Sequence, residues 1–101
     1  MSKYFLLLNW TEQGVKAVKE SASRYDAAKD MAKSLGCTLE SIHMTMGAYD
    51  IVCMLDAPSD EAAATFTLRV AKGGATRSTT LKAFQEADTA RSSQRSERTI
   101  R

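Results

Sequence analysis

Apolar residues dominate or alternate along four short stretches of the chain, and they recur at helical spacing along two longer ones. The short stretches are predicted strands, over residues 3–10, 38–46, 49–56 and 76–84. The first helical region follows Thr11, a common helix cap, and ends at Gly36, whereas the second opens at Pro58 and ends at Gly73. The order βαββαβ is the ferredoxin-like pattern, an α+β fold with a four-stranded antiparallel sheet.

Each helical region carries one apolar stripe at spacings of three and four residues. The first stripe is Val15, Val18, Ala22, Tyr25, Ala28, Ala32 and Leu35. The second stripe is Ala63, Phe66 and Val70. Side chains at this spacing share one face of a helix, so we expect both stripes to face the sheet. Ser21 and Ser23 interrupt the first pattern and could divide that region into two helices.

The ferredoxin-like order places the first and third strands at the centre of the sheet, and here both are apolar on both faces. The helices cover one face of such a sheet, so the other face would expose apolar side chains. An exposed apolar patch larger than a few hundred Å² usually marks an interface. We therefore predict a two-fold dimer in which a second copy covers this face, sheet on sheet. Ultracentrifugation that finds a monomer at micromolar concentration would contradict the dimer.

Composition narrows the class of protein and its location. The 101 residues correspond to one domain, and 44% hydrophobic with 26% charged residues is ordinary for a globular protein. A net charge of +2 is too small to indicate a nucleic-acid or membrane partner. The apolar run Tyr4–Leu8 is too short for a signal-peptide core, and no stretch reaches the roughly 20 apolar residues of a membrane span. Cys37 and Cys53 make no disulfide framework, so we expect a cytoplasmic protein with reduced thiols.

The end of the chain differs in composition from the rest. Residues 1–84 carry the fold signals and form the predicted domain. Over residues 85–101 the apolar residues are Ala87, Ala90 and Ile100, and Ser, Gln and Arg dominate. Such a segment cannot bury enough apolar surface to offset the entropy of ordering it. We therefore predict a disordered polar tail that begins as a helical turn.

The predicted hairpin between the second and third strands brings chemically active side chains together. If Gly47-Ala48 is a two-residue turn, Thr45 faces Asp50 and His43 faces Val52. His43 is the only histidine, and as a diagonal neighbour of Asp50 it could hydrogen-bond to it directly or through one water. Such a pair could hold the imidazole in one tautomer and raise its basicity. Alternatively, His43 is solvated and Asp50 accepts backbone N–H bonds, and a bulge at the turn would separate the two side chains.

The other candidate residues also have structural alternatives. Asn9 and Trp10 end the first strand, where a ligand could meet an amide and an indole, although Trp10 could instead pack at a dimer contact. Arg77 could neutralise a carboxylate ligand or remain solvated. The hairpin register places Cys37 about 16 Å from Cys53, at roughly 3.3 Å per residue. With no CxxC spacing in addition, we predict neither a disulfide nor a metal site.

Three stretches resemble the GYD domain proteins, a family named for a Gly-x-Tyr-Asp element that is here Gly47-Ala48-Tyr49-Asp50. They are residues 3–14, residues 46–62 and residues 77–84. The resemblance implies a small bacterial protein of the ferredoxin-like, dimeric α/β-barrel type, with no agreed substrate and no particular cofactor. A proline that the family pattern places near residues 21–23 is absent here. The family positions carried over are Asn9, Trp10, Gly47, Tyr49, Asp50, Arg77 and Thr79.

Similar dimeric barrels include cofactor-free monooxygenases, dehydratases and isomerases, haem-binding enzymes and effector-sensing domains, so fold analogy leaves the function open. We favour a homo-oligomeric module that binds a small apolar or aromatic molecule between sheet and helices. Its expected ligand-binding residues are Asn9, Trp10, Tyr49, Asp50, Arg77 and Thr79. The first alternative is a cofactor-independent enzyme of monooxygenase, dehydratase or isomerase type, acting on a small carbonyl or phenolic compound with His43 or Asp50 as base. The second is an assembly subunit built through exposed edge strands.

Overall fold

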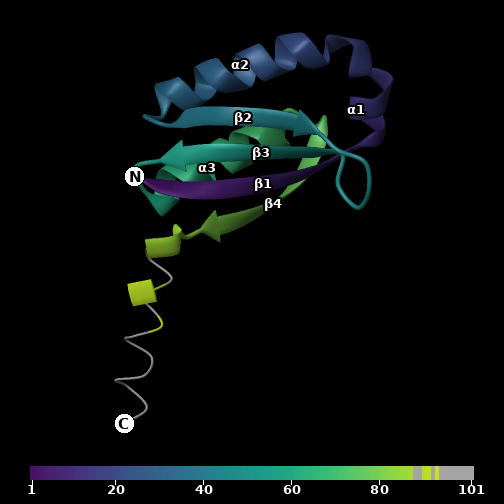
Figure 1. Cartoon of the computed structure of the whole chain (residues 1–101). Helices are drawn as coiled ribbons and strands as arrows, with labels where there is room; N and C mark the ends of the chain where they lie inside the picture. The colour runs from purple at the N-terminus through teal and green to yellow at the C-terminus, as the bar shows by residue number, and fades with distance from the viewer. Residues whose placement is uncertain (88–89, 92, 94–101) are drawn as a thin grey trace.

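A four-stranded antiparallel sheet carries the helices on one of its faces (Figure 1). The computed structural model describes residues 1–87, 90–91 and 93. The elements are β1 (Ser2–Trp10), α1 (Glu12–Lys16), the 3₁₀ turn η1 (Val18–Glu20), α2 (Ser21–Ser34), β2 (Thr38–Met44), β3 (Ile51–Ala57), α3 (Asp60–Lys72) and β4 (Thr76–Ala83). The strand order β2-β3-β1-β4 confirms the predicted ferredoxin-like α+β fold. Of the predicted tail, residues 88–89, 92 and 94–101 lie outside the described residues.

The sheet has a buried face and an open face, because successive side chains of a strand point to opposite sides. On the helix-covered face, Tyr4, Leu6 and Leu8 of β1 are buried. The core around them consists of Ile51, Cys53, Leu55 and Ala57 of β3, Ala32, Cys37, and Ala63 and Phe66 of α3. Phe5 and Leu7 of β1 point to the opposite, open face.

The first helical region is broken near its start, and the break changes which residues face the core. Helix α1 ends at Lys16, Ala17 leaves helical geometry, and η1 precedes the longer helix α2. The prediction that Val15 and Val18 continue the apolar stripe is therefore wrong, since they are 55% and 43% exposed. A stripe holds its direction only along an unbroken helix. Within α2, Tyr25, Ala28 and Ala32 pack on the core as predicted, whereas Ala22 in the first turn is exposed.

Gly14 explains why α1 lies where it does. A Cβ built on Gly14 would lie 2.0 Å from the carbonyl oxygen of Ala75, which precedes β4. The same carbonyl accepts a hydrogen bond from the backbone N–H of Thr11, at 3.0 Å. The hydroxyl of Thr11 accepts from the backbone N–H of Gly14, which confirms its predicted role as helix cap. The start of α1 is thus held directly against the start of β4.

The remaining helix ends also follow their predicted signals. Gly36 has a φ of 75°, and the backbone N–H groups of Gly36 and Cys37 donate to carbonyls of the last turn of α2, as in a Schellman motif. Helix α3 begins at Asp60, two residues after the predicted opening at Pro58, and the side chain of Ser59 caps it by accepting from the backbone N–H of Ala62 at 3.1 Å. Gly73 follows its last residue. These caps determine the residues at which α2 ends and α3 begins.

The hairpin keeps its predicted register but has a longer loop. His43 pairs with Val52 and Met44 pairs with Ile51, as expected. The strands stop at Met44 and begin again at Ile51, so the predicted extension to residue 46 and start at residue 49 are wrong. Met46 is 96% exposed, so no burial of its side chain favours a longer strand. A register shift lies between Leu39 and Ser41, and not at the turn.

Candidate functional site

A cavity of about 340 Å³ lies between the helix-covered face of the sheet and helices α2 and α3. Its sheet side is formed by Leu6, Leu8, Ile51 and Cys53. Its helix side is formed by Tyr25, Ala28 and Met31 of α2 and by Phe66 and Val70 of α3. The walls are therefore apolar and built from rigid elements.

One end of this cavity is polar. Trp10 ends β1 and Thr76 begins β4, and the two residues are paired across the sheet. Arg24 in the first turn of α2 and Arg69 in the last turn of α3 also line the cavity. Figure 1 shows α2 starting beside α1, at the end of the sheet where β1 ends. The cavity thus has an apolar interior and a rim that carries two arginines.

The sequence-predicted ligand-binding residues separate into three locations. Trp10 lines the cavity. Asn9, Arg77 and Thr79 lie on the open face of the sheet, where Asn9 pairs with Arg77. Tyr49 and Asp50 lie in the loop between β2 and β3. Only one of the six predicted residues therefore lines the cavity. The cavity itself lies between the sheet and the helices, where the ligand was expected.

Asp50 binds the backbone at the end of β1. Its carboxylate Oδ2 accepts a hydrogen bond from the backbone N–H of Trp10, at 2.9 Å. Its own backbone N–H donates to the carbonyl of Leu8 at 2.9 Å, and its carbonyl accepts from the N–H of Thr45 at 2.8 Å. The Thr45 hydroxyl donates to the carbonyl of Tyr49, at 2.6 Å. This loop therefore holds the last residues of β1, including Leu8 and Trp10, which both line the cavity.

His43 lies on the open face opposite Val52, and it is exposed. Within residues 1–87, His43 and Asp50 make no hydrogen bond or ion pair with each other, and the Asp50 carboxylate is engaged by Trp10. Catalysis by the His43–Asp50 pair stays a prediction.

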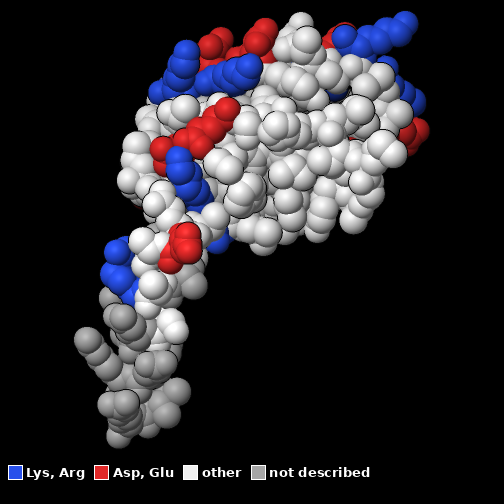
Figure 2. Space-filling view, viewed as in Figure 1, with Lys and Arg blue, Asp and Glu red and all other residues white. Residues whose placement is uncertain are grey.

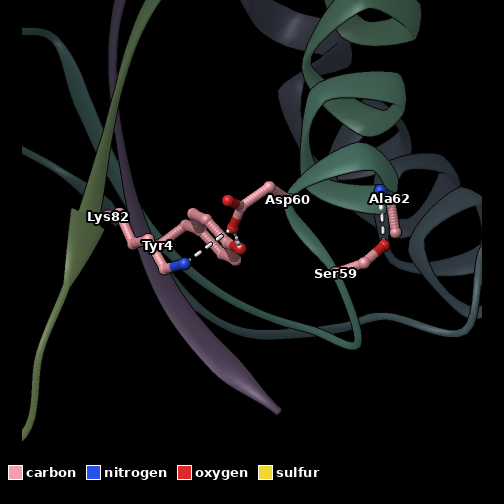
Figure 3. A network of polar contacts seen from close by, with 5 residues as sticks. All are labelled: Tyr4, Ser59, Asp60, Ala62 and Lys82. Carbon is pink, nitrogen blue, oxygen red and sulfur yellow. Dashed lines mark hydrogen bonds and ion pairs between the residues drawn. The ribbon is translucent and has the colours of Figure 1, made fainter.

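A polar network that sequence reasoning missed joins β1, β4 and α3 (Figure 3). The buried hydroxyl of Tyr4 donates to the Asp60 carboxylate, to which the Lys82 ammonium also donates at 2.9 Å. Hydrogen bonds from Tyr4 and Lys82 lower the pKa of Asp60, and the bond to Asp60 raises the pKa of Tyr4. A tyrosine with a raised pKa stays protonated at neutral pH, so its hydroxyl can donate this hydrogen bond, and the network joins the start of α3 to the sheet.

The two cysteines are buried and their thiols are free. Burial raises the pKa of Cys53 to about 11, so its thiol stays neutral and forms part of the apolar cavity wall. Among the described residues no group of three or more His, Cys, Asp or Glu side chains could hold a metal ion. Within that part of the chain, every helix is too short or too polar to cross a membrane.

The open face of the sheet is apolar at its centre. Its central residues are Phe5, Leu7, Val52 and Met54, all partly exposed, with Leu81 of β4 beside Phe5. At one end, Lys3 forms ion pairs with Glu40 at 2.5 Å and with Asp56 at 3.5 Å. Figure 2 shows charged side chains gathered along α2 and few over the middle of the sheet. This is the face of the sheet that the described helices leave uncovered.

Comparison with known proteins identifies one family. The family model for the GYD domain matches residues 4–92. Comparison with curated proteins and with solved structures gave no match. The matched range contains every residue that lines the cavity and the whole loop from Gly47 to Asp50. The resemblance expected from the sequence is thereby confirmed.

Proposed function

Since the chain belongs to the GYD domain family, we propose that it is a homo-oligomeric small-molecule-binding module of the bacterial cytoplasm. The observation that carries this proposal is the cavity between the sheet and helices α2 and α3. Ligand sites in proteins are typically concave, about 300–1,000 Å³ in volume and mostly apolar, with a few polar groups that orient the ligand. A cavity of about 340 Å³ suits a small apolar or aromatic molecule.

In this proposal, the loop that contains Tyr49 and Asp50 positions a residue of the cavity wall. Asp50 does not line the cavity, but its carboxylate holds the backbone of Trp10, which does. We therefore assign Asp50 as a positioning residue and Trp10 as a direct ligand contact. Tyr49 joins the same loop through its carbonyl, which accepts from Thr45. In this way the family element supports the cavity from outside.

The open face supports the oligomeric part of the proposal. Burial of apolar surface drives association, and a stable interface covers about 800 Å² on each partner. In a two-fold dimer, Leu7 and Val52 of each copy would face the sheet of the other copy. Asn9, Arg77 and Thr79 lie on this same face, so we assign them to the contact between copies and not to the cavity.

The alternatives raised by the sequence rest on fewer observations. A cofactor-independent enzyme needs a base beside its substrate, but neither His43 nor Asp50 lines the cavity. An assembly subunit needs edge strands β2 and β4 to pair with further copies. We keep the binding module as the proposed function because a specific volume with matching walls supports it.

The proposal is tested by filling the cavity. Ala28 lines it from α2, so Ala28→Phe would place a ring in the volume that a ligand needs. Small apolar and aromatic compounds are screened for those that raise the melting temperature. We expect at least one such compound to stabilise the native protein and to lose its effect in Ala28→Phe. Ala22→Phe is the matched control, since Ala22 is exposed on the same helix and does not line the cavity.

Two results of this experiment would count against the binding module. One is a broad screen in which no compound stabilises the folded protein. The other is stabilisation that persists in Ala28→Phe, because the compound would then bind outside the cavity.

A further inference from the structure

We propose that the ligand of this cavity is an amphipathic anion, a small carboxylic acid whose apolar body enters between sheet and helices while its carboxylate binds Arg24 and Arg69. This inference rests on the proposed binding function and adds the chemical class of the ligand. Both arginines line the cavity, and no acidic residue does. The remaining lining is apolar apart from Trp10, Tyr25, Cys53 and Thr76.

The fold brings the two arginines to the same end of the cavity. Helix α2 starts at the end of the sheet where β1 stops, and Arg24 is in its first turn. Helix α3 follows β3, which runs antiparallel to β1, so the last turn of α3 with Arg69 lies toward the same end. Gly73 and Thr76, which follow Arg69, also line the cavity. The two cations therefore approach the rim from opposite helices.

The arginines have no carboxylate partner in the described part of the chain. The ion pairs there join Lys3 to Glu40 and Asp56, Lys16 to Glu12, and Lys82 to Asp60. Among the described residues, the side chains of Arg24 and Arg69 make no ion pair and no hydrogen bond. Two like charges at the rim of a low-dielectric cavity create a positive potential that attracts an anion. A guanidinium also binds a carboxylate with two parallel hydrogen bonds.

Further hydrogen-bond donors lie at this end. The indole N–H of Trp10 and the hydroxyl of Thr76 have no hydrogen-bond partner among the described residues. An indole offers only a donor, and a hydroxyl can also donate. Donors beside two cations match an acceptor group with negative charge, whereas an ammonium would be repelled. The deeper walls, from Leu6 to Phe66, offer an anion no charged partner, so they suit the apolar part of the same molecule.

The test compares three molecules that share one tail and differ in head group: octanoate, octanol and octylamine. Trp10 is the only tryptophan of the chain and lines the cavity, so its fluorescence reports binding directly. At low salt we expect octanoate to bind most tightly. Added salt should weaken the binding of octanoate and leave the binding of octanol unchanged, because ions screen charge–charge attraction but not burial of the tail.

The variants identify the groups that bind the head. We expect Arg24→Gln and Arg69→Gln each to weaken octanoate binding by about tenfold and to leave octanol unchanged, since each removes a charge-assisted pair. Lys29→Gln is the matched control, because it removes one positive charge from α2 at an exposed position that does not line the cavity. It should bind octanoate as the native protein does. Both arginine positions are on helix surfaces, so circular dichroism should show an unchanged fold.

The outcomes separate this inference from the proposed function. Equal affinity for octanoate and octanol, or octanoate binding that is unaffected by both arginine variants, would overturn the anionic ligand and leave the cavity as a ligand site. Tightest binding of octylamine would overturn it in the same way. Binding of none of the three by the folded protein would overturn the inference and also count against the cavity as a ligand site.

Discussion

At the scale of single residues, a few contacts decide where the helices meet the sheet. Gly14 is required because the carbonyl of Ala75 occupies the space of a Cβ. Tyr4, Asp60 and Lys82 fasten the start of α3 to β1 and β4 (Figure 3). Asp50 binds the backbone of Trp10. Each of these residues joins segments that are distant in the sequence.

Gly14→Ala should destabilise the protein by about 1–3 kcal/mol, as other overpacked sites do, because the backbone of α1 or of Ala75 must move. Gly73→Ala is the control, since Gly73 has helical geometry and its Cβ would lie 3.3 Å from the nearest atom. We expect a much smaller change there. Urea unfolding measures both. Equal stability of Gly14→Ala and the native protein would show that α1 does not depend on this contact.

The pH dependence of stability should report the Asp60 network. The pKa of Asp60 is lower in the folded protein than in the unfolded chain, chiefly because Tyr4 donates to it. The folded state therefore gains stability above the ordinary Asp pKa of 3.8 and loses it as the pH falls through the lowered value. Asp60→Asn should reduce this loss of stability at acidic pH, so the acidic limb of the stability–pH curve should become flatter. The same change at Asp30, exposed on α2, serves as control, and a limb that stays unchanged in Asp60→Asn would contradict the assignment.

At the scale of elements, the loop between β2 and β3 stabilises the end of β1. In Asp50→Ala the backbone N–H of Trp10 loses its acceptor, which should cost about 1 kcal/mol and loosen the residue that lines the cavity. Asp50→Asn keeps an acceptor oxygen and should retain most of the stability. Trp10 fluorescence and urea unfolding follow the two effects. If both variants have the stability and the Trp10 fluorescence of the native protein, the loop does not stabilise the end of β1.

Local sequence signals were sufficient to predict features that depend on a single helix, strand or hairpin. Thr11 and Gly36 cap their helices as predicted, and the first strand is apolar on both faces as predicted. The hairpin register followed from Gly47, whose φ of 135° suits glycine. The Val15–Val18 stripe failed because Ala17 breaks the helix, which the apolar spacing does not show.

The site required three-dimensional information. Arg24 and Arg69 are 45 positions apart in the chain, and each alone is an ordinary surface arginine. Their relation depends on where α2 and α3 cross the sheet, and no local pattern gives that. Lys82 opposite Tyr4 follows from the strand register, so this part of the missed network was accessible. The role of Asp60 depended on the position of α3.

At the scale of the whole molecule, the two faces of the sheet differ in what covers them. Its covered face encloses the cavity, and its open face is apolar at the centre. We propose that the first binds a ligand and the second binds another copy. The two assignments are independent, since the residues of the open face do not line the cavity.

The proposed dimer should dissociate when charge is placed at the centre of the open face. Leu7 lies between Val52 and Thr79 in the sheet, so Leu7→Glu would place a carboxylate in the contact. We expect a monomer in sedimentation at micromolar concentration, whereas the native protein and the exposed control Ala22→Glu remain dimers. A native monomer, or a Leu7→Glu dimer, would contradict the sheet-on-sheet arrangement.

The cavity between sheet and helices is the proposed site for a small amphipathic ligand. The most direct measurement is an NMR titration of the isotope-labelled protein with octanoate, followed through backbone amide shifts. We expect chemical-shift changes that saturate and that cluster at cavity residues such as Leu6, Trp10, Tyr25 and Phe66. Shifts confined to the open face around Phe5 and Val52, or no saturable shifts, would contradict this assignment.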